Sequence, residues 1–189
     1  IDLSDGSTLA ELSIDRAVTA TATSVAGEFA AFVERVAPPP GDLIAAPRAT
    51  THLSIASRAD GVVYETRLDG NFAAEAFGRR LAPSGLPAQV FLLEYLPADA
   101  PRFYRVRVLS TETGEVSLPV NLRDKSQLVD ERMAGFTRSQ VMSDASGLLF
   151  TLYRGTLDGT PDGEPYAFVH TLDLHDGVWC LNVDAALEL

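Results

Sequence analysis

Short runs of apolar and β-branched residues, separated by Gly, Pro and Asp turns, recur along the chain in sets of four. The best-marked set predicts β-strands at residues 140–143, 148–153, 166–174 and 178–183. The same order of runs predicts strands at 71–77, 89–96, 103–109 and 115–120. A weaker set upstream predicts strands at 18–23, 28–33, 50–56 and 62–68. Since short turns join consecutive runs, each set is expected to form an antiparallel meander.

Turn glycines show that these sets are repeats. The glycines expected after the first strand are Gly27, Gly85 and Gly147. The glycines expected in the hairpin before the last strand are Gly61, Gly114 and Gly177. Two separate landmarks therefore recur with nearly the same period, which is somewhat longer than a usual propeller blade and leaves room for longer loops.

The repeat predicts an all-β fold of β-propeller type, built from four-stranded antiparallel blades. We expect one propeller-like domain over residues 1–189, with blade-like units at about 17–68, 71–120 and 138–183. Residues 1–12 are expected to form the outer strand of a preceding blade. Three blades and one stray strand do not close a ring, because propellers usually carry about 4–8 blades. The sequence therefore predicts additional blades or a protein partner that completes the ring.

Composition narrows the classes of function. A net charge of −11 argues against binding to nucleic acid and to anionic membrane surfaces. No apolar run approaches the roughly 20 residues of a membrane span. The single cysteine, Cys180, excludes an internal disulfide and a multi-cysteine zinc site. The chain opens on Ile1 without a signal segment, as expected for a mature or trimmed form of a precursor.

The third unit resembles a known repeat family. The runs Asp144-x-x-Gly147-x-x-Phe150-Thr151-Leu152-Tyr153 and Ala167-Phe168-Val169-His170-x-Leu172-Asp173-Leu174-x-x-Gly177 are similar to blades of exported bacterial propellers. These are the YVTN/quinoprotein-amine-dehydrogenase-like repeat proteins, notably those of actinobacteria. The resemblance covers about residues 17–183. It implies an extracytoplasmic protein, either secreted or anchored as a lipoprotein.

Three histidines and one acidic loop are the candidates for binding a metal. His52 and His170 fall on third strands of two units, and His175 falls in a hairpin turn, but their spacing matches no metal-ligand motif. The loop 158–164 has the composition of a calcium loop, yet two prolines interrupt the alternate ligand positions that such a loop needs. A polar surface loop is the simpler interpretation.

No catalytic constellation is visible in the sequence. Cys180 has no partner cysteine, and the chain lacks the G-x-S-x-G, P-loop and G-x-G-x-x-G motifs. A ring of arginines from loops could bind an anion, although scattered surface charges are the simpler interpretation. The arginines concerned are Arg48, Arg102, Arg123, Arg138 and Arg154.

The sequence therefore favours a non-catalytic binding or scaffolding module, with no cofactor and no metal. One alternative is a propeller enzyme of the lactonase or quinoprotein-like type, with Asn71, Asp144 and His170 facing the central axis. The other alternative is a structural subunit of a larger assembly, in which other chains cover the exposed blade edges.

Overall fold

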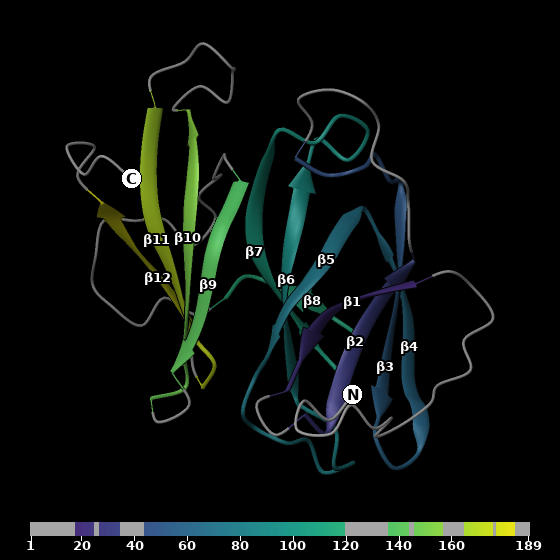
Figure 1. The fold of residues 1–189 in the computed structure, drawn as a ribbon. Coiled ribbons are helices and arrows are strands. Elements are labelled where there is room, and N and C mark those ends of the chain that lie inside the picture. Colours follow the sequence, from purple (N-terminus) through teal and green to yellow (C-terminus); the bar gives the residue numbers. More distant parts are fainter. Residues whose placement is uncertain are drawn as a thin grey trace, which may run out of the picture.

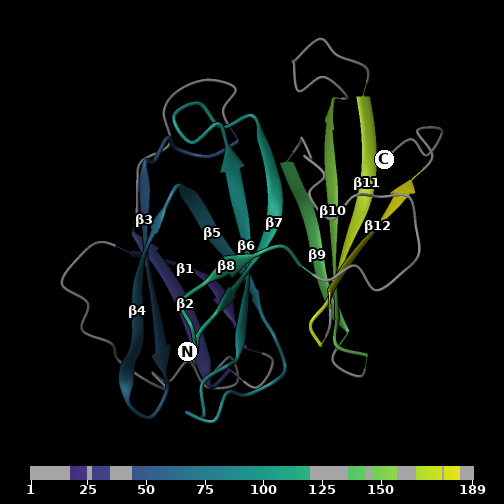
Figure 2. The ribbon, with the colours of Figure 1, turned by 180° about the vertical axis from the view of Figure 1, so that it is seen from behind.

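The chain folds into three antiparallel β-sheets that stand beside one another (Figures 1 and 2). The structure, a computed structural model, describes residues 18–24, 27–34, 44–119, 136–143, 146–156, 165–175 and 177–183. Within these ranges the chain forms twelve strands and no helix. The all-β class and the three four-stranded antiparallel sheets predicted from the sequence are confirmed. The strand expected within residues 1–12 lies outside the described residues.

Each sheet is a meander, because neighbouring strands in the sheet are also neighbours in the sequence. The first sheet consists of β1 (Val18–Thr23), β2 (Phe29–Glu34), β3 (Thr50–Ser57) and β4 (Gly61–Asp69). The middle sheet consists of β5 (Asn71–Phe77), β6 (Gln89–Leu96), β7 (Phe103–Ser110) and β8 (Val116–Ser117). The third sheet consists of β9 (Phe136–Ser143), β10 (Leu148–Thr156), β11 (Pro165–Asp173) and β12 (Gly177–Val183).

Two strand boundaries differ from the sequence prediction. The strand expected at 115–120 is only the two-residue β8, which is exposed and ends shortly before Pro119, a residue without a backbone N–H for a ladder hydrogen bond. The strand expected at 140–143 is longer, because β9 begins at Phe136 and pairs with β10 as far as Arg154. Pro119 therefore accounts for the early end of β8, whereas pairing with β10 accounts for the early start of β9.

Glycines with a positive φ form the equivalent turns of the three repeated sheets. The turn before the second strand of each sheet contains Gly27, Gly85 or Gly147, with φ of 68°, 85° and 67°. A side chain is disfavoured at such a φ, because its Cβ crowds the following carbonyl oxygen. The recurring glycines thus mark equivalent turns of the three sheets.

The middle sheet is packed on both of its faces. The face toward the third sheet is called the forward face, and the face toward the first sheet the backward face; the same two names, in the same sense, are used for every sheet. Along β6, Val90 and Leu92 point backward while Phe91 and Leu93 point forward, and all four are buried. A strand buried on both faces is an uninterrupted apolar run rather than an alternating one.

Two apolar cores therefore hold the sheets together. The core between the first and middle sheets contains Ala22, Ala31, Val33, Leu53, Ile55, Leu68, Phe72, Ala74, Phe77, Val90, Leu92 and Leu109. The core between the middle and third sheets contains Ala76, Phe91, Leu93, Tyr104, Val106, Val108, Leu149, Leu172 and Leu174. A backbone hydrogen bond of 2.8 Å from Arg79 N to Leu174 O also joins the middle and third sheets.

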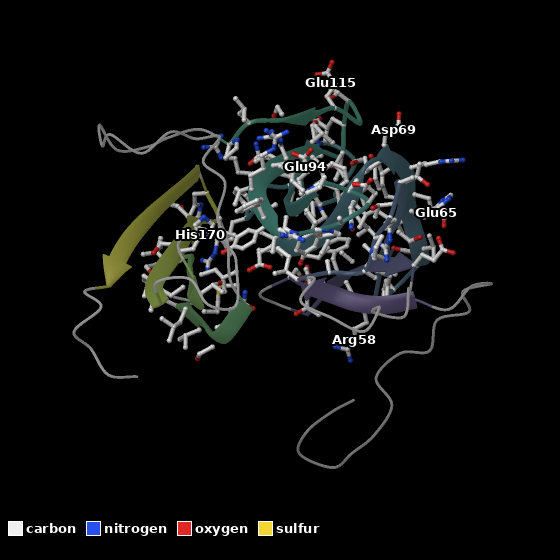
Figure 3. All side chains as sticks on the ribbon, turned by 90° about the horizontal axis from the view of Figure 1, so that it is seen from above. Arg58, Glu65, Asp69, Glu94, Glu115 and His170 are labelled. Atoms are coloured by element: carbon white, nitrogen blue, oxygen red, sulfur yellow. The ribbon has the colours of Figure 1, made fainter. Side chains whose placement is uncertain are left out.

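The first strands of the sheets lie next to one another. Strand β1 packs beside β5, and a side-chain hydrogen bond joins β5 to β9. The last strands lie at the outside: seen from above (Figure 3), Glu65 in β4 and Glu115 before β8 stand at the periphery in different directions. The sheets thus fan out from a row of first strands.

Candidate functional site

Each first strand contains a β-bulge where it pairs with the second strand. The register skips one residue of the first strand in every sheet: Thr21 in β1, Glu75 in β5 and Arg138 in β9. A bulge adds a residue to one strand and turns its side chain in a direction that the regular pleat does not allow. Glu75 is the acidic member of this set.

The Glu75 side chain crosses from the middle sheet to the third sheet. Its Oε1 accepts a hydrogen bond of 2.7 Å from Gln140 Nε2 of β9 and one of 3.4 Å from Thr151 Oγ1 of β10. Gln140 Nε2 also donates to Thr151 Oγ1 at 3.1 Å. The three side chains therefore form a closed polar triangle beside the apolar core.

This environment changes the acidity of Glu75. Burial raises the pKa of its carboxyl from 4.5 to about 7, and the hydrogen bonds from Thr151 and Gln140 lower it in part. Water stabilises a carboxylate better than an apolar interface does, so enclosure favours the protonated form. Near neutral pH, Glu75 is therefore divided between its acid and its carboxylate.

Two further polar side chains belong to the same region. Burial raises the pKa of Tyr95 to about 12, and the Glu75 carboxylate adds to this rise. Burial lowers the pKa of Arg48. The positive charge of Arg48 lowers the pKa of Tyr95 and so opposes the effects of burial and of Glu75. Arg48 Nη2 donates to the backbone oxygen of Glu34 at 2.6 Å, which holds this cation at the end of β2.

The arrangement supplies one group that is suited to proton transfer. A carboxyl whose pKa lies near the working pH can accept and return a proton, and in its acid form it can donate a hydrogen bond. The neighbouring phenol and guanidinium add a hydrogen-bond donor and a positive charge. Glu75, with Gln140 and Thr151, is therefore the candidate functional centre of the described chain.

A second cluster of charged side chains forms ion pairs within the middle sheet. Arg105 Nε and Arg107 Nε lie 2.6 Å and 2.9 Å from Glu94 Oε2 on the backward face. Arg105 also donates to Glu94 Oε1 at 3.3 Å. Because the carboxylate is engaged by two cations across neighbouring strands, a structural role explains this cluster best.

The histidines do not come together. His52 lies in β3 of the first sheet and His170 in β11 of the third, with the middle sheet between them. His170 is buried, and burial lowers its pKa to about 4, so it is neutral at pH 7. His175 is exposed, and its backbone N–H donates to Asp173 Oδ1 at 2.9 Å.

Asn71 is buried and holds loops in place. Its Nδ2 donates to the backbone oxygens of Ala46 at 2.8 Å and Ala98 at 3.4 Å, which ties the segment before β3 to the loop after β6. These bonds explain an amide at this position without a ligand on a central axis.

The remaining candidates are distributed over the chain. Arg102 is exposed after β6, and Arg138 and Arg154 lie in β9 and β10 rather than in loops. Cys180 lies in β12, opposite His170 in the strand register. Asp144, Arg123 and the loop 158–164 lie outside the described residues.

The described residues hold neither a metal-binding cluster nor a membrane-spanning helix. Among them, no group of three or more His, Cys, Asp or Glu side chains is arranged to hold a metal ion. The part of the chain that the structure describes contains no helix with the length and apolarity that crossing a bilayer requires. Comparison of the chain with protein-family models, curated proteins and solved structures found no match.

Sequence reasoning missed Glu75. Its one signal is that Glu75 is the only charged residue in β5, the run Asn71–Phe77 of otherwise apolar and amide side chains. A charge in a run that is otherwise expected to be buried indicates either a bulge or a polar partner across the interface, and the structure has both.

Proposed function

We propose that the chain is a non-catalytic, extracytoplasmic β-propeller module that binds protein or a ligand and acts as a scaffold. The observation that carries this proposal is the fan of meanders, in which the first strands adjoin and the middle sheet is packed on both faces. Propeller blades pack face to face in this order around a common axis. The resemblance of residues 144–177 to exported propeller repeats supports the extracytoplasmic location.

Such a module works through surfaces that its rigid sheets hold in place. Loops on one side of stacked sheets form a docking surface without any catalytic group. The outward faces of the first and third sheets are available for additional sheets, either from further blades or from a protein partner. A structural subunit in a larger assembly would use the same faces.

One observation favours the enzyme alternative. Glu75 lies on the first strand of the middle sheet, and its carboxyl has a pKa of about 7. A propeller enzyme of the lactonase or quinoprotein-like type would use such a group, together with a metal or cofactor, at the axis formed by the first strands.

The mass and elemental content of the native particle separate these functions. We expect a particle heavier than one 20.3 kDa chain, without a stoichiometric metal or chromophore. A bound metal or chromophore in a one-to-one ratio would overturn the non-catalytic proposal in favour of the enzyme. A native particle that consists of one chain without metal or chromophore, and that binds no other protein, would overturn the proposal of a scaffold.

A further inference from the structure

The forward face of the third sheet is built like the forward faces of the other two sheets. The strand registers show which positions of the three sheets are equivalent. In each sheet the first residue of the second strand pairs with a residue of the third strand, and these pairs are Phe29–Ser57, Gln89–Ser110 and Leu148–Asp173. Two residues into the second strand, the forward cross-strand pairs are Ala22–Ala31, Ala76–Phe91 and Val141–Phe150. All three pairs are apolar.

Only the pair on the third sheet is uncovered. The exposed fractions of the equivalent first-strand residues are 8% for Ala22, 3% for Ala76 and 61% for Val141. The first two are buried because the backward face of the next sheet covers them. Val141 therefore occupies a position that is buried wherever a following sheet is present.

Neighbouring positions repeat this difference. Leu152 is half-buried, whereas its equivalent Leu93 in the middle sheet is buried. Val169 is half-buried, whereas its equivalent Val106 is buried. Val141, Phe150, Leu152 and Val169 thus form a partly exposed apolar surface beside the buried Thr171, and exposed apolar surface of this kind marks an interaction site.

The chain itself carries the matching backward face. On the first sheet, Ala30 and Phe32 of β2 point backward and are half-buried. Their equivalents in the middle sheet, Val90 and Leu92, are fully covered by the first sheet. At one end of the stack Val141 on the forward face is exposed. At the other end Ala30 and Phe32 on the backward face are partly exposed, while their β3 partners Ala56 and Ser54 are buried.

We propose, on the basis of the proposed function, that the partner completing the propeller is a second copy of this chain. The forward face of the third sheet of one copy packs on the backward face of the first sheet of the other, and the reverse contact forms at the same time. A twofold rotation makes both contacts at once, so the assembly closes instead of growing into a filament. Two sets of three sheets give six, within the usual range of propeller blades.

Sedimentation or light scattering of the purified chain tests this pairing. The particle in solution is expected to have twice the 20.3 kDa mass of one chain. The substitution Val141→Asp places a charge on the forward face, where it is tolerated in a single copy because the site is 61% exposed. Each pair would enclose two such charges, so we expect the dissociation constant to rise about a hundredfold or more.

A matched control separates an effect at the forward face from the general effect of replacing an exposed apolar residue by Asp. Leu118, which is 48% exposed, follows β8 at the outer edge of the middle sheet, and Leu118→Asp should leave the mass unchanged. Phe32→Asp, on the opposite face of the pairing, should separate the copies as Val141→Asp does. Circular dichroism checks that each variant remains folded.

Other outcomes overturn the pairing. A single-chain mass for the purified wild type, or a double mass that Val141→Asp leaves intact, contradicts it. If the purified chain is single while the native particle is heavier, the second copy is refuted but the scaffold function stands. If Leu118→Asp separates the copies as well, contact through the two faces is refuted.

Discussion

Replacing Glu75 by Gln should remove a pH-dependent loss of stability. The glutamine side chain would retain an oxygen that accepts from Gln140 Nε2 and Thr151 Oγ1, so the polar triangle of the folded chain is preserved. What changes is the cost of enclosing a charge. In the wild type the folded chain holds the Glu75 proton more tightly than the unfolded chain, because its pKa is raised from 4.5 to about 7.

The sign and size of the effect follow from proton linkage. Below about pH 4.5 the carboxyl is protonated in both states, so its contribution to stability is fully present. As the pH rises toward 7, the unfolded chain releases the proton first and stability falls; above pH 7 the loss is complete. The difference between 4.5 and about 7, at roughly 1.4 kcal/mol per pH unit, sets a ceiling of about 3.5 kcal/mol. Since Glu75 is only half-buried, we expect about 1–3 kcal/mol.

Urea unfolding at pH 5, 6, 7 and 8 measures this effect as the difference between Glu75→Gln and the wild type. His170 acts in the opposite direction, because its pKa is lowered to about 4 and its contribution is lost as the pH falls below 6.5. Both proteins contain His170, so its contribution cancels in the difference. Glu115→Gln, at an exposed position, controls for the loss of one negative charge.

The variant should gain stability relative to the wild type as the pH rises from 5 to about 7, and the difference should then level off by pH 8. A difference that stays constant over this range would mean that Glu75 is ionised and hydrated throughout, and the account of its burial would be wrong. A gain shared by Glu115→Gln would assign the effect to net charge instead.

Three further comparisons test core packing, turn strain and an ion pair. Leu92→Ala should lower the free energy of unfolding by about 2–5 kcal/mol, because this side chain is fully buried, whereas Val62→Ala, at 38% exposure, should change it by about 0.5 kcal/mol or less. Gly147→Ala and Gly27→Ala both place a side chain at a φ near +67° or +68°, which costs about 1–2 kcal/mol in each variant. Only Gly147→Ala also brings a Cβ within 3.0 Å of other side chains. Thermal melting should therefore show a larger loss of stability for Gly147→Ala than for Gly27→Ala. Glu94→Gln should cost about 1–3 kcal/mol in urea unfolding, because two arginines lose their carboxylate. High salt should reduce this cost only in part, because these side chains are mostly buried.

Local sequence determined much of the fold. Glycines at 27, 85 and 147 favour a left-handed turn, and the runs after them alternate or are continuously apolar, so both the strands and their order could be predicted. Which face of each strand packs on which sheet could not be predicted, because the run Val90–Leu93 is apolar on both sides.

The candidate site depended on features that sequence reasoning does not reach. Glu75 leaves the regular pleat only because β5 pairs with β6 through a bulge, and its partners Gln140 and Thr151 follow more than sixty residues later. Asn71 was proposed to face an axis, but it holds two loops together instead. Long-range pairing decides both outcomes.

The consecutive strand order also bears on how the protein forms during synthesis. Every strand pairs only with its sequence neighbours, so each sheet can assemble as soon as its own residues have left the ribosome. The middle sheet, however, keeps Phe91, Tyr104 and Val106 open to water until the third sheet has been made. A ribosome that pauses once residue 119 has left its exit tunnel would hold a nascent chain with this apolar face uncovered, and we expect chaperones to bind at that stage of translation.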